Sequence, residues 1–479
     1  MNRKNVIRIL LLWCLLALLW LITLVETTTL TSYNNFFTSG ELFAWLTANR
    51  YEVNDIAGYC IRYVIPYWIL CTLIFCFLGW GAYKIVKSYS RKAFVGCLII
   101  ELLLLMPFTV LPLCCNLLRE SLMVARQINN IKEHQHDSSD FRYGAQKTDK
   151  TERKEIYVLA VGESLRYKNL SLNGIYERKT TPLLEQQKNL CLYTDYYASA
   201  TLTQHAMPTL LTPATADNFT EHFRYKSIAA AFDEAGFRTA LVSHRAQLMN
   251  NDYHNYLAQD FDTLIFVEHD SLIAPMVRQL TDGNEKLFIV THYLGNHMFY
   301  TNRTDDCLIW RPDYNADSKV KSDSLFLNAY DNSILYTDRL LSEQIKLLES
   351  SDAVSCWLFL SDHGEYISNR VSGHGHTYHP TKEEYHVPLM VWYSDEYKAA
   401  YPDKVANVIK HKDEPLCGDH VFWSVLDMAG IQLGTQNDCS SESEIRIRNE
   451  KLEMSIFSST WLPHERTLLL PDGQTLLQL

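Results

Sequence analysis

In the stretch "CWLFLSDHGEY" (residues 356–366), an apolar run passes without a break into a polar one. Residues 357–360 are all large and apolar, which is typical of a short strand buried on both faces. Asp362 and His363 follow at once, and both side chains can bind a metal. A buried strand that ends in two metal-ligand residue types suggests that its tip faces a shared site.

Four other short runs are also mainly apolar, and segments with helical periodicity lie between the runs. The apolar runs are 156–161, 238–243, 286–292, 356–361 and 387–392, and the helical patterns are 227–236, 327–350 and 421–430. Apolar strands that alternate with helices indicate a parallel sheet covered on both faces. The sequence therefore predicts an α/β domain with a mostly parallel sheet and helices on both of its faces.

Polar groups follow four of these predicted strands. Glu163 follows the first, His244 the second, His292 ends the third, and Asp362 and His363 follow the fourth. The carboxyl ends of parallel strands share one edge of a sheet, where ligands bind. A single Asp or His at a loop start is more often a helix cap or a solvated residue. Several such residues that meet on one edge of a sheet predict a zinc site, because carboxylate oxygen and imidazole nitrogen suit that metal.

The segment "YASATLTQHAMPTLL" (197–211) supplies candidate nucleophiles for that site. Ser199, Thr201 and Thr203 each carry a hydroxyl near the expected start of a helix. Free N–H groups at a helix N-terminus hold phosphate, and a nearby zinc lowers the pKa of a hydroxyl. Ser and Thr are also ordinary N-cap residues. Spacing alone does not choose among the three.

Three apolar runs near the amino terminus are long enough to cross a bilayer, which takes about 20 residues. They cover about 6–25, 63–83 and 93–116. The first lacks a convincing cleavage site, so a retained anchor is expected. Basic residues set the orientation of such spans. They place the amino terminus and the loop 84–92 in the cytoplasm and residues after 116 outside.

The rest of the chain divides into a connecting segment and one large domain. Residues 117–154 are polar; we expect a helix along the membrane surface at their start and then a linker. Residues 155–479 form the expected catalytic domain. The chain of 479 residues has a formal charge of −11, and no nucleic-acid partner is expected.

Several ordered segments resemble the phosphoethanolamine transferases of the alkaline phosphatase and sulfatase superfamily. That family includes enzymes that modify lipid A in the lipopolysaccharide and confer polymyxin resistance. The segment "SDHGE" alone would indicate only the superfamily, whereas the ordered series is more specific. The matching segments are "VLAVGESLRYKNLSLNGIYERKTTP", "ASATLTQHAMPTLL", "THYLGNH", "AYDNSILYTDRLL", "SDHGE", "GHGH" and "HVPLMVW".

The resemblance implies roles by position in these segments. Glu163, Thr203, Asp362 and His363 are similar to the zinc ligands of the family. Thr203 matches the threonine that becomes phosphorylated, which selects it over the two other hydroxyls.

The resemblance also implies a second group of histidines. His297 and His374 are similar to histidines that bind substrate or a second zinc. His376 is a rival for His374 because the spacing differs, and His292 also matches a family position.

The chain departs from the family pattern at three points. Ser199 and Thr209 stand where many members have disulfide-forming cysteines. Three spans are expected here, whereas lipid A enzymes commonly have five. A family lysine has no clear counterpart, and His244 and Arg245 lie in its region. These departures leave the acceptor open.

The resemblance implies a multi-pass protein of the bacterial inner membrane with its catalytic domain in the periplasm. It implies zinc-dependent transfer of phosphoethanolamine from phosphatidylethanolamine to lipid A or another envelope glycolipid, through a phosphothreonine. The alternatives are a phosphoglycerol transferase, a sulfatase-like hydrolase and a non-catalytic ectodomain.

Overall fold

The structure is a computed structural model. It describes residues 14, 17–18, 20–29, 61, 64–88, 111–134, 140–148, 151–244, 253–283, 286–298, 300–313, 322–368, 373–375, 380–434 and 453–479. The chain divides into two compact units, Met1–Gln127 and Ile128–Leu479.

The first unit is helical where it is described. Residues 20–29 are helical, and α4 (Ile65–Ser88) follows; α6 (Leu111–His134) begins in this unit and ends in the second. Two tryptophans connect the first two helices: the Trp20 indole donates to Thr72, and the Trp68 indole donates to Thr28.

The structure describes one of the three predicted membrane spans more completely than the other two. The span 63–83 falls mostly within α4, whereas 6–25 and 93–116 lie largely outside the described residues. Across the part of the chain that the structure describes, no helix has the length and apolar character required to cross a membrane.

A seven-stranded sheet forms the centre of the second unit. Its strands, in spatial order, are β3 (Leu190–Tyr193), β9 (Leu389–Tyr393), β8 (Val354–Ser361), β2 (Glu155–Gly162), β7 (Lys286–His292), β5 (Arg238–Ser243) and β6 (Thr263–Phe266). The five strands from β8 to β6 run parallel, and β9 is antiparallel to both of its neighbours. The prediction of a mostly parallel sheet is confirmed, and β9 makes it a mixed sheet.

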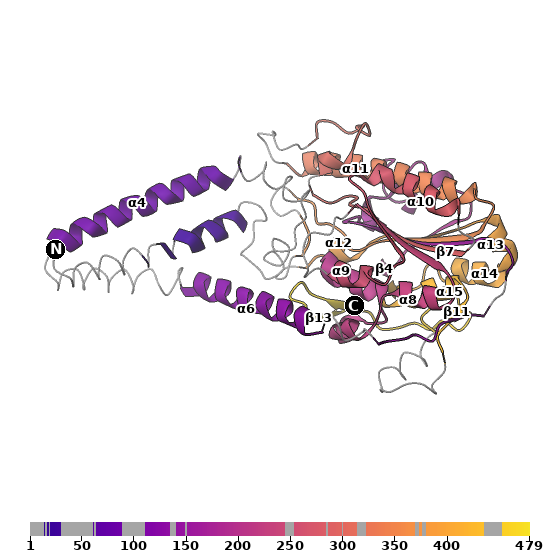
Figure 1. The fold of residues 1–479 in the computed structure, drawn as a ribbon. Coiled ribbons are helices and arrows are strands. Elements are labelled where there is room, and N and C mark those ends of the chain that lie inside the picture. Colours follow the sequence, from indigo (N-terminus) through magenta and orange to yellow (C-terminus); the bar gives the residue numbers. More distant parts are fainter. Residues whose placement is uncertain are drawn as a thin grey trace. The chain divides into compact units, whose positions relative to one another are not determined.

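Helices cover both faces of this sheet because its central strands are apolar on both sides. Alternate residues of β2 enter two different cores: Leu159 packs with one cluster and Val158 with the other. Figure 1 shows α10 (Ile273–Thr281) and α11 (Asp323–Glu349) on one side and α8 (Ile228–Glu234) and α15 (Asp419–Met428) on the other. The predicted arrangement of helices on both faces is therefore confirmed.

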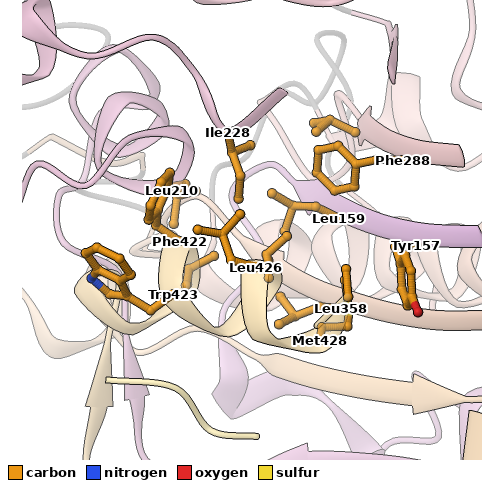
Figure 2. Close-up of a cluster of buried hydrophobic side chains, with 14 of the residues drawn as sticks. Tyr157, Leu159, Leu210, Ile228, Phe288, Leu358, Phe422, Trp423, Leu426 and Met428 are labelled. Atoms are coloured by element: carbon orange, nitrogen blue, oxygen red, sulfur yellow. The ribbon is translucent and has the colours of Figure 1, made fainter. Parts of the chain in front are cut away.

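The Leu159 side of the sheet has the larger core. Figure 2 shows Leu159 and Leu358 of the sheet beside Phe422 and Leu426 of α15. The helices α7 (Thr203–Leu211), α9 (Tyr253–Ala258), α13 (Asp395–Ala400) and α14 (Pro402–Lys410) contribute to the same cluster. Because α7 begins at Thr203, this core also fixes the start of the helix that carries that hydroxyl.

Smaller elements complete the second unit. They are α12 (Lys382–Tyr385), the pair β1 (Gln146–Lys147) and β11 (Ile431–Gln432), the pair β4 (Tyr196–Tyr197) and β10 (Leu416–Cys417), and the hairpin of β12 (Thr467–Leu469) and β13 (Leu476–Gln478). Through β1, part of the predicted linker 117–154 joins the second unit: Tyr143 is buried, and Lys147 pairs with the buried Glu155 at 2.8 Å.

Candidate active site

The carboxyl edge of the sheet brings the predicted polar groups together. The sheet hydrogen bonds continue past the strand ends: Asp362 N donates to Gly162 O at 3.0 Å, and His244 N donates to His292 O at 3.0 Å. Glu163 directly follows β2, which lies between β7 and β8. The ends of neighbouring strands are thus held in register. The side chains that follow them, from Glu163, His292 and Asp362 onwards, lie along one edge of the sheet, which we call the rim.

Thr203 lies against the acidic part of that rim. Its Oγ1 is 3.1 Å from Glu163 Oε2 and 3.5 Å from His363 Nε2. The same His363 nitrogen is 2.9 Å from Glu163 Oε1 and 3.5 Å from Asp362 Oδ2. The structure therefore brings together the four residues that the sequence resemblance grouped, in one continuous set of contacts.

All four side chains are buried, and Thr203, at 4%, is the most exposed of them. Burial lowers the pKa of His363, but the neighbouring Asp362 and Glu163 carboxylates outweigh it and raise this pKa to about 10. Two buried carboxylates beside the same imidazole nitrogen require a positive charge near them. The cluster therefore favours a cation.

The donor chemistry of the rim fits zinc. Two overlapping groups have ligand atoms within 4.8 Å of one another, and Glu163 belongs to both. One group adds His297 and His374, and the other adds His292 and Asp362. Zinc takes imidazole nitrogen and carboxylate oxygen as ligands. These residues, with His363 and the Thr203 hydroxyl, fit one zinc ion or a pair of them.

The three candidate hydroxyls have different surroundings. Thr203 is the first residue of α7, where main-chain N–H groups and the helix dipole favour negative charge. Ser199 instead donates to Asp419 Oδ1 at 3.3 Å, and Thr201 is buried. Within the described contacts, Thr203 is the hydroxyl that reaches Glu163 and His363.

A buried carboxylate that the sequence analysis missed orients His374. Glu365 Oε2 is 2.8 Å from His374 Nδ1, and Tyr300 donates its hydroxyl to Glu365 Oε1. Burial raises the pKa of Glu365, but the charge and hydrogen bond of His374 lower it below its usual value. The contact occupies Nδ1 of His374 and leaves its other ring nitrogen for a ligand. The rival residue His376 lies outside the described residues.

A second missed carboxylate, Asp270, holds the loop after β7. It accepts hydrogen bonds from the main-chain N–H groups of Leu294 and Gly295, each at 2.9 Å, and contacts His244 Nδ1 at 2.9 Å. Asn296 N in turn donates to Glu163 O at 3.0 Å. Asp270 lies far from the rim in sequence, within a polar segment, so no local pattern marked it. Glu365 could have been noticed because it comes two residues after His363.

This fold and rim define a class of α/β proteins in which polar side chains gather at the carboxyl ends of the strands of a mixed sheet. The model of the family described as Sulfatase matches residues 155–431. That is more than half of the chain, and the chain belongs to this family.

Individual sequence relatives with names are more specific than the family model. The chain is 28% identical over 259 residues to the Kdo(2)-lipid A phosphoethanolamine 7''-transferase of Escherichia coli K12, covering 50% of this chain and 44% of that protein. It is 27% identical over 298 residues to the phosphoethanolamine transferase EptA of Helicobacter pylori, covering 58% and 54%. The chain thus matches about half the length of these curated relatives.

Solved structures share the fold. The zinc complex of the C-terminal periplasmic domain of EptC from Escherichia coli has a TM-score of 0.60 at 20% identity, covering 70% of this chain and 95% of that one. The integral membrane protein lipooligosaccharide phosphoethanolamine transferase A from Neisseria meningitidis has a TM-score of 0.66 at 18% identity, covering 92% and 85%. At these identities the likeness concerns the fold.

Proposed function

We propose that this chain is a membrane-anchored, zinc-dependent phosphoethanolamine transferase whose catalytic unit faces the periplasm. One observation carries the proposal: the Thr203 hydroxyl lies at the start of a helix, 3.1 Å from Glu163 and 3.5 Å from His363. The names of the sequence relatives support phosphoethanolamine as the transferred group. The zinc complex of the EptC domain supports the choice of metal.

The first step of the proposed reaction forms a bond between Thr203 Oγ1 and the phosphorus of phosphatidylethanolamine. The hydroxyl, which donates to Glu163, gives up its proton to solvent, and the bond from phosphorus to the glyceryl oxygen breaks. The glyceryl oxygen takes up a proton from solvent as diacylglycerol leaves, and phosphoethanolamine remains on Thr203. The free N–H groups at the start of α7 face the growing negative charge of the phosphoryl oxygens.

In the second step an acceptor oxygen forms a bond to the phosphorus, and the bond from phosphorus to Thr203 Oγ1 breaks. Thr203 takes up a proton to regenerate its hydroxyl, and an acceptor hydroxyl gives up its own proton to solvent. The acceptor is a hydroxyl or phosphate oxygen of lipid A or another envelope glycolipid. Glu163, Asp362, His363 and the surrounding histidines would hold the zinc ion, which would supply charge neutralisation and lower the pKa of the Thr203 hydroxyl. A membrane anchor fits this chemistry because donor and acceptor lie in the same lipid leaflet.

Mass spectrometry of envelope lipids tests the proposal. We expect glycolipids that carry added phosphoethanolamine in cells that express the chain, and none in cells that express Thr203→Ala. Added phosphoglycerol would establish the phosphoglycerol transferase. Released headgroup without any modified lipid would establish a hydrolase, and unchanged lipids together with a metal-free protein would establish a non-catalytic domain.

A further inference from the structure

The carboxyl-terminal hairpin lies outside the residues that the family model matches, yet it returns to the loop before Thr203. Its strands are β12 and β13, whereas the family match ends at residue 431. Leu469 N donates to Ser199 O at 2.7 Å, and Ala200 forms a parallel bridge with Leu469. The hairpin therefore makes main-chain contacts three and four residues before Thr203.

Side-chain packing holds the hairpin in this place. Leu468 and Leu469 are buried, and Leu468 packs with Tyr197 and Tyr385. Burial of an apolar leucine side chain stabilises such a contact. The hairpin is thus bound to the catalytic unit by a small core of its own.

Polar contacts at the other end of β12 reinforce this packing. Arg466 forms an ion pair with Asp195 at 2.9 Å, and its guanidinium lies 4.7 Å from the centroid of the Tyr197 ring. Both partners lie just before the loop that leads to Thr203. The hairpin therefore contacts this segment at two points, residues 195–197 and residues 199–200.

The loop is held from its other side by the segment around Tyr385. Ala198 N donates to Tyr385 O at 2.8 Å, and the Tyr385 hydroxyl donates to Leu469 O at 3.3 Å. Ser199 Oγ fits tightly beside Gly418, where an added Cβ would lie 2.2 Å from it. The loop 197–202 thus runs between two main-chain partners that also contact each other.

We propose that the carboxyl-terminal hairpin is a positioning element that fixes the loop 197–202 and thereby places the Thr203 hydroxyl. Thr203 begins its helix, so its position follows the loop before it more closely than the residues deeper in α7 do. A misplacement of about 1 Å costs on the order of 10²-fold in rate. The catalytic part of this proposal rests on the proposed function, whereas the structural part does not.

Two variants of the full chain separate the main-chain contact from the side chain. Leu469→Pro removes the N–H that donates to Ser199, and Leu469→Val keeps it with an apolar side chain. Hydrogen exchange of the peptide 198–205 reports the loop directly. We expect exchange about five- to tenfold faster in Leu469→Pro and unchanged exchange in Leu469→Val, because one hydrogen bond contributes about 1 kcal/mol.

Kinetics with phosphatidylethanolamine in vesicles give the second measurement. We expect kcat to fall about 10- to 100-fold in Leu469→Pro with KM for the donor and bound zinc unchanged, because loop position affects the chemical step. Leu469→Val stays within about twofold of the wild type. If Leu469→Pro does not fold, Arg466→Ala, which releases Asp195 and the Tyr197 ring, gives the same readouts with a smaller effect.

The outcomes distinguish the two proposals. Wild-type exchange and wild-type kcat in Leu469→Pro overturn the positioning role. Equal losses in Leu469→Pro and Leu469→Val overturn the role of the main-chain contact, because the change of side chain then accounts for the whole effect. Faster exchange in Leu469→Pro beside a wild type that transfers no phosphoethanolamine supports the hairpin contact and rejects the proposed function.

Discussion

Thr203 is the residue on which the proposed chemistry depends, and its substitution gives the most direct prediction. Thr203→Ala removes the hydroxyl that contacts Glu163, so we expect transfer to fall on the order of 10⁴-fold or more. Thr203→Ser keeps a hydroxyl and retains some activity. Thr201→Ala is the matched control, and we expect its loss of transfer to be much smaller.

Peptide mass spectrometry after exposure to donor lipid should find phosphoethanolamine on Thr203. An adduct on Ser199 or Thr201 would reassign the nucleophile.

Asp270 tests whether the loop after β7 must be held in place. Asp270→Asn replaces one acceptor oxygen of the pair that binds Leu294 N and Gly295 N. We expect zinc affinity or activity to fall about 10- to 100-fold, as is typical when a group behind the ligands is lost. Asp262→Asn is the control, because Asp262 also accepts a main-chain hydrogen bond, from Thr239, but has no contact with this loop. Competition with a zinc chelator measures the affinity; equal values for both variants would count against the assignment.

Asp419 gives a prediction about pH and stability. Burial, with a smaller effect of Asp217, raises the pKa of Asp419 to about 7. The folded protein therefore keeps a proton there between about pH 4 and pH 7, whereas the unfolded chain loses it. Over this range the residue lowers the free energy of unfolding as pH rises, by up to about 1.4 kcal/mol per pH unit.

The matched variant Asp419→Asn keeps an acceptor for Ser199 but cannot titrate. Relative to the wild type, its melting temperature should therefore improve steadily from pH 4 to pH 7. If the melting temperatures of the two proteins instead change with pH in the same way over this range, Asp419 is already ionised in the folded state.

At the level of elements, the loop between β8 and α12 depends on one glycine. A Cβ at Gly364 would lie 2.1 Å from the carbonyl oxygen of Glu383, and Gly364 N donates to Glu384 O. Gly364→Ala therefore pushes the segment after His363 away from α12, and overpacking of this kind typically costs about 1–3 kcal/mol. Gly283→Ala is the control, because nothing lies within 4 Å of its Cβ position. Thermal melts that show the same midpoint for both variants would contradict this packing argument.

The same elements show how much of the fold could be predicted from the sequence. The runs that became β2, β5, β7 and β8 were visible because buried parallel strands are apolar throughout. The strands β3 and β6 were missed: both are edge strands, with partly exposed residues and short runs. The antiparallel direction of β9 depends on how the chain returns after β8, which no local pattern contains.

The site residues, like the strands, include some that the sequence predicted and some that it did not. Residues at strand tips could be placed on one rim because sheet topology alone brings them together. Glu365 and Asp270 act through side-chain contacts with His374 and His244, which lie 9 and 26 residues away along the chain. Such contacts depend on how the loops fold back at the strand ends, and a single sequence does not specify them.

At the scale of the whole molecule, residues before the predicted domain start at residue 155 pack within the second unit. Tyr143 is buried and donates its hydroxyl to Lys226 O, and β1 pairs with β11 near the end of the sheet domain. Lys147 also lies beside the fully buried Glu155 at 2.8 Å. A fragment that begins after these residues leaves a buried carboxylate without its nearest cation.

This arrangement predicts a difference between two exported fragments. Residues 140–479 keep Tyr143 and Lys147, whereas residues 150–479 lose both. Removing one partner of a buried ion pair costs about 3–5 kcal/mol, and loss of the Tyr143 packing adds to it. We therefore expect the shorter fragment to melt on the order of 5 °C or more below the longer one.

Zinc content separates this effect on stability from an effect on the site. Because the rim is built from β2, β5, β7 and β8, both fragments should bind zinc when folded. Lys147→Met in the longer fragment isolates the ion pair, and its melting temperature should fall between those of the two fragments. Equal melting temperatures for 140–479 and 150–479 would mean that the segment before β2 does not stabilise the unit, and the domain would then begin at β2.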